Sequence, residues 1–501
     1  MIKSLCEIAQ AAGLISNDQR IIRSICNDSR QAEPGCLFIA RRGVRTDGHD
    51  HIDQALIRGA AAVIIDKDRI ELGKKIPGGI ACLAANDTFQ AEARIAPFFY
   101  DYPSAKMKIM AVTGTNGKTT TTYILEKILQ ACGIKTGVIG TINMRWNNTE
   151  ITSNNTTPEP LLLQKTLGQM HDDNVKTVMM EVSSHALALN RVQGMEFDSA
   201  LFTNLTQDHL DFHRDMQAYL QAKLMIFSML KKSLKKNKTA VSWRENFFHP
   251  QIAGFLASLS GLEIRYFSLL EGLPDANLFF PENIEFSTSG TTFILRHGQK
   301  KISRIKTCLV GEYNALNLLG ALSALPEQGI LHEEPVKKAL LNLSVPGRLE
   351  IIPDPAGRLV VVDYAHTHDA LEKVLGVLKK ISHNRLICVF GCGGDRDKKK
   401  RPLMGQAACR LADHVIITSD NPRTEDPLLI LHDIETGIKN DFSNYQLIPD
   451  RHNAISAAIK MTANNDIILL AGKGHETYQE INGVRHHFDD RLAAAEVIRN
   501  T

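Results

Sequence analysis

This sequence has no long apolar run and only a small net charge. No part of its 501 residues reaches the roughly 18 consecutive apolar residues that a membrane-spanning helix requires, so we expect no membrane insertion. The 58 lysines and arginines nearly balance the 55 aspartates and glutamates, which leaves a net charge of +3. This balance argues against nucleic acid or an anionic membrane as the main partner.

Cysteine is present without a recognisable pattern. The nine cysteines are odd in number, and their spacing is not that of a disulfide framework or a zinc site. Cys388 and Cys392 are four residues apart, but no further His or Cys pair follows at ligand spacing. Met1–Glu7 lacks the basic start and apolar run of a signal peptide, so none is expected. We therefore expect the protein in the reducing cytoplasm.

The length and the 44% hydrophobic content predict roughly three domains, each able to bury a core. Short apolar strands alternate with helical segments, a pattern typical of α/β folds with doubly wound, mostly parallel sheets. We place a smaller N-terminal α/β domain at residues 1–105, a central domain with a phosphate-loop-type sheet at residues 106–345, and a Rossmann-like α/β domain at residues 346–501. Tyr100–Ser104 is the expected linker after the first domain.

Apolar runs that end in turn residues predict the strands. They are Leu37–Ala40, Ala61–Ile65, Met107–Val112, Val138–Gly140, Thr177–Glu181, Ser199–Thr203, Leu359–Val362, Leu386–Phe390, His414–Thr418 and Asp466–Leu470. Between residues 265 and 310 the pattern changes, and Phe267-Ser268, Ile284–Phe286 and Thr292–Leu295 predict an antiparallel insertion. The basic run Lys231–Lys238 is interpreted as a solvated helix end.

A glycine-rich loop connects the strand Met107–Val112 to a predicted helix. The helix covers Thr119–Cys132, because apolar residues recur there at helical spacing and Gly133 stands where a C-cap is expected. Between them, Thr113–Thr120 reads Thr-Gly-Thr-Asn-Gly-Lys-Thr-Thr. A loop of this composition between a strand and a helix predicts a phosphate-binding site.

The chemistry of this loop fits ATP. Its glycines let backbone N–H groups approach phosphate oxygens, and the helix N-terminus adds partial positive charge. Lys118 would neutralise the terminal phosphates, and the Thr119 hydroxyl would reach Mg²⁺. The residues predicted to bind ATP here are Gly114, Thr115, Asn116, Gly117, Lys118, Thr119 and Thr120.

Two further side chains follow the ends of predicted strands. Glu181 closes one strand, and His209 lies shortly after another. Either alone would be an ordinary solvated side chain, but ligand groups gather at the carboxyl ends of strands in open α/β sheets. We therefore predict that Glu181 and His209 hold a metal together with Thr119. Lys223, considered by residue type alone, is a helix-surface lysine.

The loop departs from the usual phosphate loop, since Val112 stands where the first glycine belongs. In this form it resembles the loop of the Mur ligases and of their relatives, the folylpolyglutamate and cyanophycin synthetases, which join a carboxylate to an amine at the expense of ATP. In Mur ligases the lysine that matches Lys223 is carbamylated, which would supply hard oxygen ligands to Mg²⁺. The resemblance implies Thr119, Glu181, His209 and Lys223 at the metal, and as catalytic residues Lys118, Glu181, His209 and carbamylated Lys223.

The N-terminal region is similar to the uridine-nucleotide domain of MurE-type ligases. Asn27–Arg30, Gly35–Ala40 and Asp47–Asp50 carry this likeness, and Asn155–Glu159 matches further along. Leu189 stands where some members have glutamine, which leaves a polar contact there in doubt. The residues implied for the UDP-sugar-peptide substrate are Ser29, Asn155, Thr156, Thr157, Ser183 and Arg191.

The nucleotide should also be contacted from later segments. Glu312–Asn317 resembles the family's adenine-contacting segment, and Asn317 is the residue implied there. Arg348 and Asp363 would approach from the third domain. Val362–His368 follows the family pattern, except that His368 replaces a proline.

Three loops in the last region each follow a predicted strand: Gly391–Arg396, Ser419–Arg423 and Ala471–Glu476. Together they offer cations and acceptors, which suits a substrate with ammonium and carboxylate ends. Asp-Asn-Pro-Arg resembles the signature of ligases that add meso-diaminopimelate, whose distal carboxylate Arg423 would bind. The residues implied for diaminopimelate are Arg396, Asp420, Asn421, Pro422, Arg423, Gly472 and Glu476.

The resemblance thus implies a monomeric cytoplasmic ligase of peptidoglycan synthesis, which joins meso-diaminopimelate to UDP-N-acetylmuramoyl-L-Ala-D-Glu with ATP and Mg²⁺. The alternatives are a lysine-adding ligase, which Arg423 disfavours, and a folylpolyglutamate synthetase, which should lack the N-terminal domain. A phosphate-loop motor acting on nucleic acid would show basic stripes, and none is suggested. His209 and His366 both stay open as acceptors of the amine proton.

Overall fold

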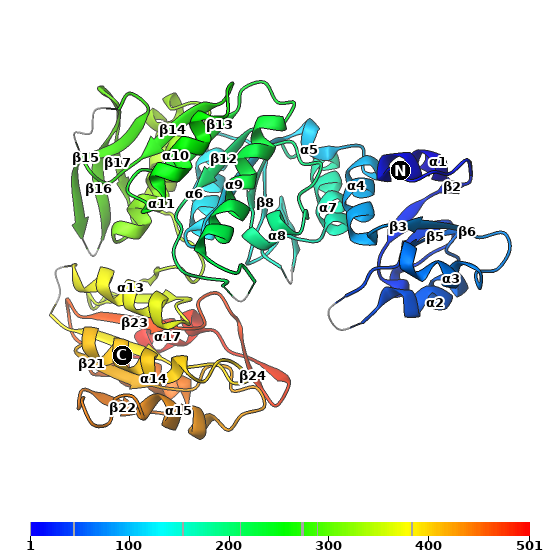
Figure 1. The fold of residues 1–501 in the computed structure, drawn as a ribbon. Coiled ribbons are helices and arrows are strands. Elements are labelled where there is room, and N and C mark those ends of the chain that lie inside the picture. Colours follow the sequence, from blue (N-terminus) through cyan, green and yellow to red (C-terminus); the bar gives the residue numbers. More distant parts are fainter. Residues whose placement is uncertain are drawn as a thin grey trace. The chain divides into compact units, whose positions relative to one another are not determined.

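The computed structural model describes residues 2–43, 46–152, 155–210, 212–271, 275–287, 289–381 and 384–501. The chain forms two compact units (Figure 1). The first comprises Met1–Phe267 with Gly320–Pro326, and the second comprises Ser268–Leu319 with Glu327–Thr501. The division into three domains at residues 105 and 345 stays a prediction. In the described part of the chain, no helix is both long enough and apolar enough to cross a membrane.

The N-terminal part of the first unit is built on a four-stranded parallel sheet in the order β3-β4-β5-β6. These strands are β3 (Ser24–Cys26), β4 (Cys36–Ile39), β5 (Ala62–Asp66) and β6 (Ala81–Ala85). The flanking elements are β1 (Lys3–Ser4), β2 (Ile21–Ile22), α1 (Leu5–Ala12), α2 (Ile52–Ile57), α3 (Ile70–Gly73) and α4 (Thr88–Phe99). Apolar side chains of α1 and α4 pack in a core with the sheet, and those of α2 form a second core. The two strands predicted here are confirmed within one residue.

The rest of the first unit is a larger sheet in the order β10-β9-β8-β11-β7-β12-β13-β14. Its strands are β7 (Lys108–Thr113), β8 (Thr136–Ile139), β9 (Met144–Trp146), β10 (Thr149–Ile151), β11 (Thr177–Glu181), β12 (Ser199–Phe202), β13 (Thr239–Trp243) and β14 (Glu263–Phe267). All neighbours from β8 to β14 pair in parallel, and β9 and β10 add an antiparallel edge. The strand β7 therefore lies between β11 and β12, so the loop after it opens beside the ends of both neighbours.

Helices of this unit are α5 (Pro103–Lys106), α6 (Lys118–Ala131), α7 (Pro160–Asp172), α8 (Ser184–Ala188), α9 (Met216–Lys232) and α10 (His249–Ala257). The helix predicted after the glycine-rich loop is confirmed as α6, with Gly133 following its end at a φ of 74°. At the predicted linker, Asp101 and Tyr102 adopt positive φ angles, and α5 begins directly afterwards at Pro103. The helices α4 and α7 lie side by side, so the N-terminal sheet is attached through α4 (Figure 1).

The basic run at the end of α9 is only partly solvated, which corrects the interpretation from sequence. Lys235 Nζ lies 3.4 Å from Asp198 Oδ2 and donates a 2.6 Å hydrogen bond to the Met107 carbonyl. Lys238 Nζ donates to the carbonyls of Lys231 and Ser233. These two lysines satisfy carbonyl oxygens around the end of the helix, a role that a charge pattern alone does not reveal.

The second unit begins with three antiparallel strands, β15 (Leu278–Ser287), β16 (Gly290–His297) and β17 (Lys300–Thr307). They confirm the antiparallel insertion for two of its three predicted segments. The prediction for Phe267 is wrong, because Phe267 closes β14, which pairs in parallel with β13 in the first unit. The helices that follow are α11 (Glu312–Ala324) and α12 (Glu334–Leu341).

A six-stranded sheet in the order β18-β19-β23-β20-β21-β22 completes the second unit. Its strands are β18 (Glu350–Ile352), β19 (Leu359–Asp363), β20 (Leu386–Phe390), β21 (His414–Ile417), β22 (Tyr445–Leu447) and β23 (Ile467–Ala471), and only β18 is antiparallel to its neighbour. Around it lie α13 (His368–Lys379), α14 (Lys400–Leu411), α15 (Pro427–Glu435), α16 (Arg451–Lys460), α17 (Asp490–Arg499) and the hairpin of β24 (Tyr478–Ile481) and β25 (Val484–His487). Two cores, one with α13 to α15 and one with α16 and α17, confirm the predicted α/β sheet with helices on both faces.

Candidate active site

The glycine-rich loop is held tightly against the segment that follows β12. Gly114 has a φ of 143°, and a Cβ added there would lie 1.9 Å from Thr203 Oγ1. Asn116 N donates to Asn204 Oδ1 at 2.9 Å, and Thr203 Oγ1 donates to the Asn116 carbonyl at 2.6 Å. The Lys118 ammonium folds back to the carbonyls of Gly114 and Thr115, at 3.0 and 2.9 Å. The loop is therefore fixed in shape at the N-terminus of α6, as phosphate binding requires.

Glu181 points toward this loop from the end of β11. Its side chain is buried, and Oε1 accepts hydrogen bonds from Thr119 Oγ1 and from the backbone N–H of Thr141, each at 2.9 Å. Oε2 accepts from Thr141 Oγ1 at 3.0 Å. The predicted proximity of Glu181 and Thr119 is thus present, and it puts a carboxylate next to the hydroxyl at the start of α6.

Gly140 leaves the space that this carboxylate occupies. A Cβ at position 140 would lie 2.3 Å from Glu181 Oε1, whose hydrogen bonds keep it in place. We expect Gly140→Ala to displace Glu181 and to cost about 1–3 kcal/mol in the free energy of unfolding, a typical price of overpacking. Thermal unfolding and ATP-dependent activity measure the effect.

Gly254→Ala is the matched control, because Gly254 lies in α10 with nothing within 4 Å of the added Cβ. It should leave activity intact and keep or raise the melting temperature, since alanine is favoured over glycine in helices. Unchanged stability and activity in Gly140→Ala would contradict the steric argument.

His209 lies on the segment after β12 with a φ of 53° and a side chain that is 46% exposed. Its Nε2 is 3.5 Å from Asp208 Oδ2, and its ring packs against those of His185 and Tyr219. Among the described residues, no three His, Cys, Asp or Glu side chains form a group that could hold a metal by themselves. The hard oxygens of Thr119 and Glu181 fit Mg²⁺ nevertheless, because this ion is usually held by one or two carboxylates plus phosphate oxygens.

Lys223 is buried in α9 rather than exposed on its surface. Its Nζ donates a 2.7 Å hydrogen bond to the Gly114 carbonyl and lies 4.6 Å from the centre of the Tyr219 ring. Burial holds the pKa of Lys223 well below the usual lysine value, and the nearby Lys118 ammonium lowers it further. The residue-type interpretation as a surface lysine is therefore wrong, and the side chain lies buried beside the glycine-rich loop.

A cavity of about 510 Å³ opens on the N-terminal sheet. Ser29 belongs to its lining, and Ser29 Oγ donates a 2.7 Å hydrogen bond to Gln54 Oε1. The lining residues are Asn27, Asp28, Ser29, Arg30, Phe38, Arg41, Gly43, Thr46, Gly48, His51 and Gln54. They include parts of the three N-terminal motifs that resemble a uridine-nucleotide domain.

The segment before α7 joins this region to Glu181. Thr157 Oγ1 donates to the Glu181 carbonyl at 2.9 Å and accepts from the backbone N–H of Ser183 at 3.0 Å. Arg191 donates to the Thr157 carbonyl at 3.3 Å, and Thr156 Oγ1 accepts from Thr141 Oγ1 at 3.1 Å. The predicted substrate residues Thr156, Thr157, Ser183 and Arg191 are thus brought together, with Asn155 at the start of the same segment.

The nucleotide residues predicted in the second unit lie on α11 and at the start of the six-stranded sheet. Arg348 lies over the Tyr364 ring, 5.0 Å from its centre. Asp363 accepts backbone hydrogen bonds from Leu349 and Ala365, and its burial raises the pKa of its carboxyl group. Asp363 therefore holds the turn that carries Arg348, while Asn317 is partly exposed on α11.

The loops after β20, β21 and β23 enclose a buried polar cluster. Lys473 Nζ, fully buried, donates to Asn421 Oδ1 at 3.1 Å and lies 3.6 Å from Asp420 and 3.5 Å from Glu476. Asn421 Nδ2 in turn donates to Glu476 Oε2 at 2.8 Å. Burial raises the pKa of Glu476, an effect that Lys473 opposes.

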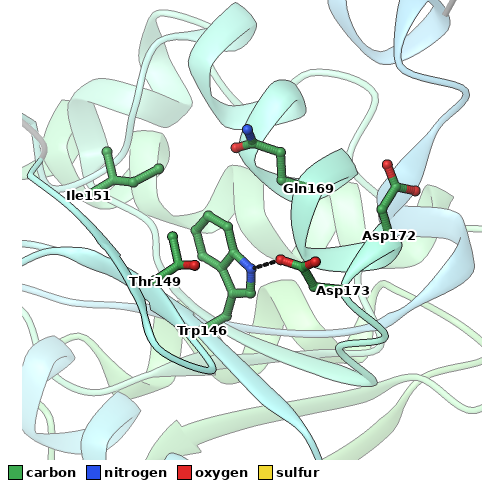
Figure 2. Close-up of a pocket in the computed structure, with 6 residues that line it drawn as sticks. All are labelled: Trp146, Thr149, Ile151, Gln169, Asp172 and Asp173. Atoms are coloured by element: carbon green, nitrogen blue, oxygen red, sulfur yellow. Dashed lines mark hydrogen bonds between the residues drawn. The ribbon is translucent and has the colours of Figure 1, made fainter.

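A second cavity, in the first unit, contains none of the predicted site residues. Figure 2 shows this cavity, which has a volume of about 340 Å³ and is lined by Trp146, Thr149, Ile151, Gln169, Asp172 and Asp173.

Arg423 is fixed at the edge of this cluster. Its φ is 52°, its side chain is 23% exposed, and one guanidinium nitrogen donates to the Gly394 carbonyl at 2.6 Å. Gly472 (φ 112°) lies close to Asp420, since a Cβ there would be 3.1 Å from Oδ2. Pro422 is buried, whereas Arg396 is exposed on its loop. The structure therefore brings together most of the residues predicted for diaminopimelate, with Arg396 turned to solvent.

Three segments of the chain match Mur ligase domains. Residues 21–96 match the catalytic domain of the Mur ligase family, residues 112–325 the middle domain and residues 347–474 the glutamate ligase domain. A UDP-N-acetylmuramoyl-L-alanyl-D-glutamate--2,6-diaminopimelate ligase of Bacillus cereus is 40% identical over 479 residues, which cover 95% of this chain and 94% of the relative. Ligase 1 of that name from Clostridium acetobutylicum is 41% identical over 490 residues, 97% of either chain. The chain belongs to the Mur ligase family.

Solved structures agree with the fold of this Mur ligase. A structure of a UDP-N-acetylmuramoyl-L-alanyl-D-glutamate--2,6-diaminopimelate ligase aligns with a TM-score of 0.71 and 33% identity, covering 100% of this chain and 99% of the other. MurF from Acinetobacter baumannii aligns with a TM-score of 0.65 at 19% identity, covering 100% and 99%, and shows the likeness of fold alone.

Sequence reasoning missed the role of Lys473 and the ion pair between Arg41 and Glu159 in this Mur ligase. Lys473 lies in the recognised motif Ala471–Glu476, directly after β23. Its position in a loop at the end of a strand was the signal that could have indicated a site residue. Arg41 and Glu159 form an ion pair at 2.9 Å across 118 residues of sequence. No local pattern marks a pair so distant, so only the fold reveals it.

Proposed function

We propose that this chain is an ATP-dependent ligase that adds meso-2,6-diaminopimelate to the D-Glu γ-carboxylate of UDP-N-acetylmuramoyl-L-Ala-D-Glu during peptidoglycan precursor synthesis. The observation that carries the proposal is the identity of about 40% with ligases of that name over nearly the full length. The cytoplasm is the proposed location and a monomer the proposed state, without nucleic-acid or membrane partners.

ATP would bind at the glycine-rich loop, with Lys118 shifting from the loop carbonyls to the terminal phosphates. Asn317, Arg348 and Asp363 are the further residues proposed to contact ATP. Thr119, Glu181, His209 and the modified Lys223 are the proposed Mg²⁺ ligands, and the bound ion would supply positive charge to the phosphates. Thr119 and Glu181 already lie within hydrogen-bond distance of one another, which supports this assignment.

The burial of Lys223 supports its proposed carbamylation. A neutral amine is the form that attacks CO₂, and the lowered pKa of Lys223 favours that form. In this reaction the neutral amine attacks the carbon of CO₂, the Nζ–C bond forms as one C–O π bond breaks, and loss of one N–H proton to water leaves a carbamate anion. The carbamate would lie beside Lys118 and offer oxygen ligands where an ammonium would repel a cation.

The γ-phosphoryl group would then pass from ATP to the γ-carboxylate, which yields an acyl phosphate and ADP. The diaminopimelate amine attacks the acyl carbon, the tetrahedral intermediate expels phosphate, and an amide forms. His366 is one candidate for the amine proton, since burial lowers the pKa of its imidazole and favours the neutral, accepting form. His209 stays the other candidate.

The loops that carry the polar cluster around Lys473 would hold the amino acid. Asp420, Asn421 and Glu476 offer acceptors for its ammonium groups, while Arg423 offers a planar donor pair for a carboxylate. Pro422, Gly472 and Arg396 complete the proposed set. Lysine lacks the distal carboxylate and would leave Arg423 without a partner, which disfavours it.

Phosphate release tests the proposal directly. Purified protein receives ATP, Mg²⁺ and UDP-N-acetylmuramoyl-L-Ala-D-Glu, with meso-diaminopimelate, lysine or no amine. We expect release to depend on the amine and to be fastest with diaminopimelate. Equal release in all three reactions would contradict the ligase assignment, and faster release with lysine would contradict the choice of amine.

A further inference from the structure

A chain of alternating charges links the N-terminal cavity to the substrate segment before α7. Arg41 donates to both carboxylate oxygens of Glu92 at 3.1 Å and to Glu159 Oε2 at 2.9 Å. Glu159 Oε1 lies 3.0 Å from a guanidinium nitrogen of Arg191. Asn27 extends the chain at one end with a 3.0 Å hydrogen bond to Glu92.

Both ends of this chain lie at proposed substrate sites. Asn27 and Arg41 line the cavity on the N-terminal sheet. At the other end, Arg191 donates to the Thr157 carbonyl, and Thr157 donates to the Glu181 carbonyl beside the glycine-rich loop. The charges therefore connect the place proposed for the nucleotide with the place proposed for the reacting carboxylate.

The chain of charges is mostly buried. Glu92 on α4 has a fully buried side chain, and those of Arg41, Arg191 and Glu159 are 18, 14 and 29% exposed. Arg41 is further held over the Phe89 ring, 4.3 Å from its centre. Buried ion pairs add little net stability, because desolvation offsets their attraction. Their cost suggests that the arrangement serves the geometry of a site.

Glu159 is the only carboxylate among these residues that pairs with both arginines within the described part of the chain. It precedes α7 and uses one oxygen for each guanidinium. The Nε atoms of Arg41 and Arg191 are buried and have no hydrogen-bond partner among the described residues.

We propose that Glu159 is a positioning residue that couples the nucleotide cavity to the carboxylate site by fixing Arg41 and Arg191 relative to one another. The inference rests on the proposed function, which requires one substrate to span both places. The uridine-nucleotide end would then help the remote carboxylate react, as binding energy from non-reacting parts of a substrate can do.

The test compares two substrates: UDP-N-acetylmuramoyl-L-Ala-D-Glu and the same sugar-peptide without UDP. The ratio of their kcat/KM values measures how much the nucleotide contributes. In Glu159→Gln we expect this ratio to fall about tenfold, while KM for ATP changes by less than about twofold, since only the coupling is removed. A purely structural role would lower both kcat/KM values alike, and an unchanged ratio would overturn the proposal.

Glu71→Gln is the matched control, because Glu71 is 74% exposed and pairs with Lys74 on the surface. It should leave the ratio unchanged.

Glu159→Asp retains the charge but has a shorter side chain, and it should give an intermediate ratio. It also provides a second variant if Glu159→Gln folds poorly. The double variant Arg41→Met/Glu159→Gln should lower the ratio by less than the product of the two single-variant effects. Both changes remove the same interaction, so their effects are not independent.

Failure of the proposed function is recognised separately. A wild-type protein that releases no phosphate with any amine would contradict the ligase assignment. The coupling would still be judged by calorimetry, from the Kd of the complete nucleotide-sugar-peptide relative to that of UDP. A preference for the complete ligand that is equal in wild type and Glu159→Gln would overturn the coupling.

Discussion

Replacing Arg423 by alanine should abolish the preference for meso-diaminopimelate over lysine. The ratio of kcat/KM values for the two amines should fall by up to ~10⁴-fold, the range in which a site built for a polar group rejects an analogue that lacks it. The Arg423 guanidinium is anchored to the Gly394 carbonyl at 2.6 Å and lies 4.0 Å from Glu480, so its donors are fixed in direction. Phosphate release with each amine gives the ratio.

The backbone at position 423 requires a second variant. Its φ of 52° is uncommon for residues other than Gly, Asn and Asp, so Arg423→Asn should remove the guanidinium with less strain than alanine. Arg410→Ala is the control, since Arg410 is 57% exposed on α14 and pairs with Glu372. If both Arg423 variants still prefer diaminopimelate, the assignment of its distal carboxylate to Arg423 is wrong.

Replacing Lys223 by methionine should lower kcat by about 10²–10³, the effect of removing one electrostatic contributor to a phosphoryl or acyl transfer site. Methionine has a similar shape but cannot form a carbamate. Lys223 is fully buried, and its Nζ contacts the Gly114 carbonyl of the glycine-rich loop. Turnover of ATP measures the loss, and carbon-13 spectroscopy with labelled CO₂ detects the carbamate in the wild type alone.

The melting temperature of the protein without the carbamate should also depend on Lys223. Its lowered pKa means that the unfolded chain binds the proton more readily, so Lys223 destabilises the fold increasingly as the pH falls below the ordinary lysine pKa. In CO₂-free buffer, Lys223→Met should therefore melt above the wild type, by a margin that narrows as the pH rises toward that value. Lys232→Met, at an exposed position of α9, should show neither effect. A Lys223→Met enzyme with more than half of the wild-type kcat would refute the role.

Much of the fold followed from local pattern. The strand Thr177–Glu181 was predicted to the residue, and α6 was displaced by one position, because buried parallel strands and helix starts carry strong local signals. Phe267 was misassigned because the sequence of a short strand does not show whether its neighbour runs parallel or antiparallel to it. The structure shows that β14, which contains Phe267, pairs in parallel with β13.

Sequence could likewise place some residues of the site and not others. Glu181 could be placed beside Thr119 from its position at a strand end, a rule that holds for open α/β sheets. The burial of Lys223 could not be deduced by residue type, since it depends on how α9 packs against the loop. The pairing of Arg41 with Glu159 could not be deduced for a related reason, because nothing close in sequence to either residue indicates its partner.

The Gly114 carbonyl accepts hydrogen bonds from two amines, Lys118 at 3.0 Å and Lys223 at 2.7 Å. Conversion of Lys223 to a carbamate would place an anion beside the Lys118 ammonium, which attracts it. Under the proposed carbamylation, any change in nucleotide affinity on reaction with CO₂ would be matched by an equal change in CO₂ affinity on nucleotide binding, because the two equilibria are linked.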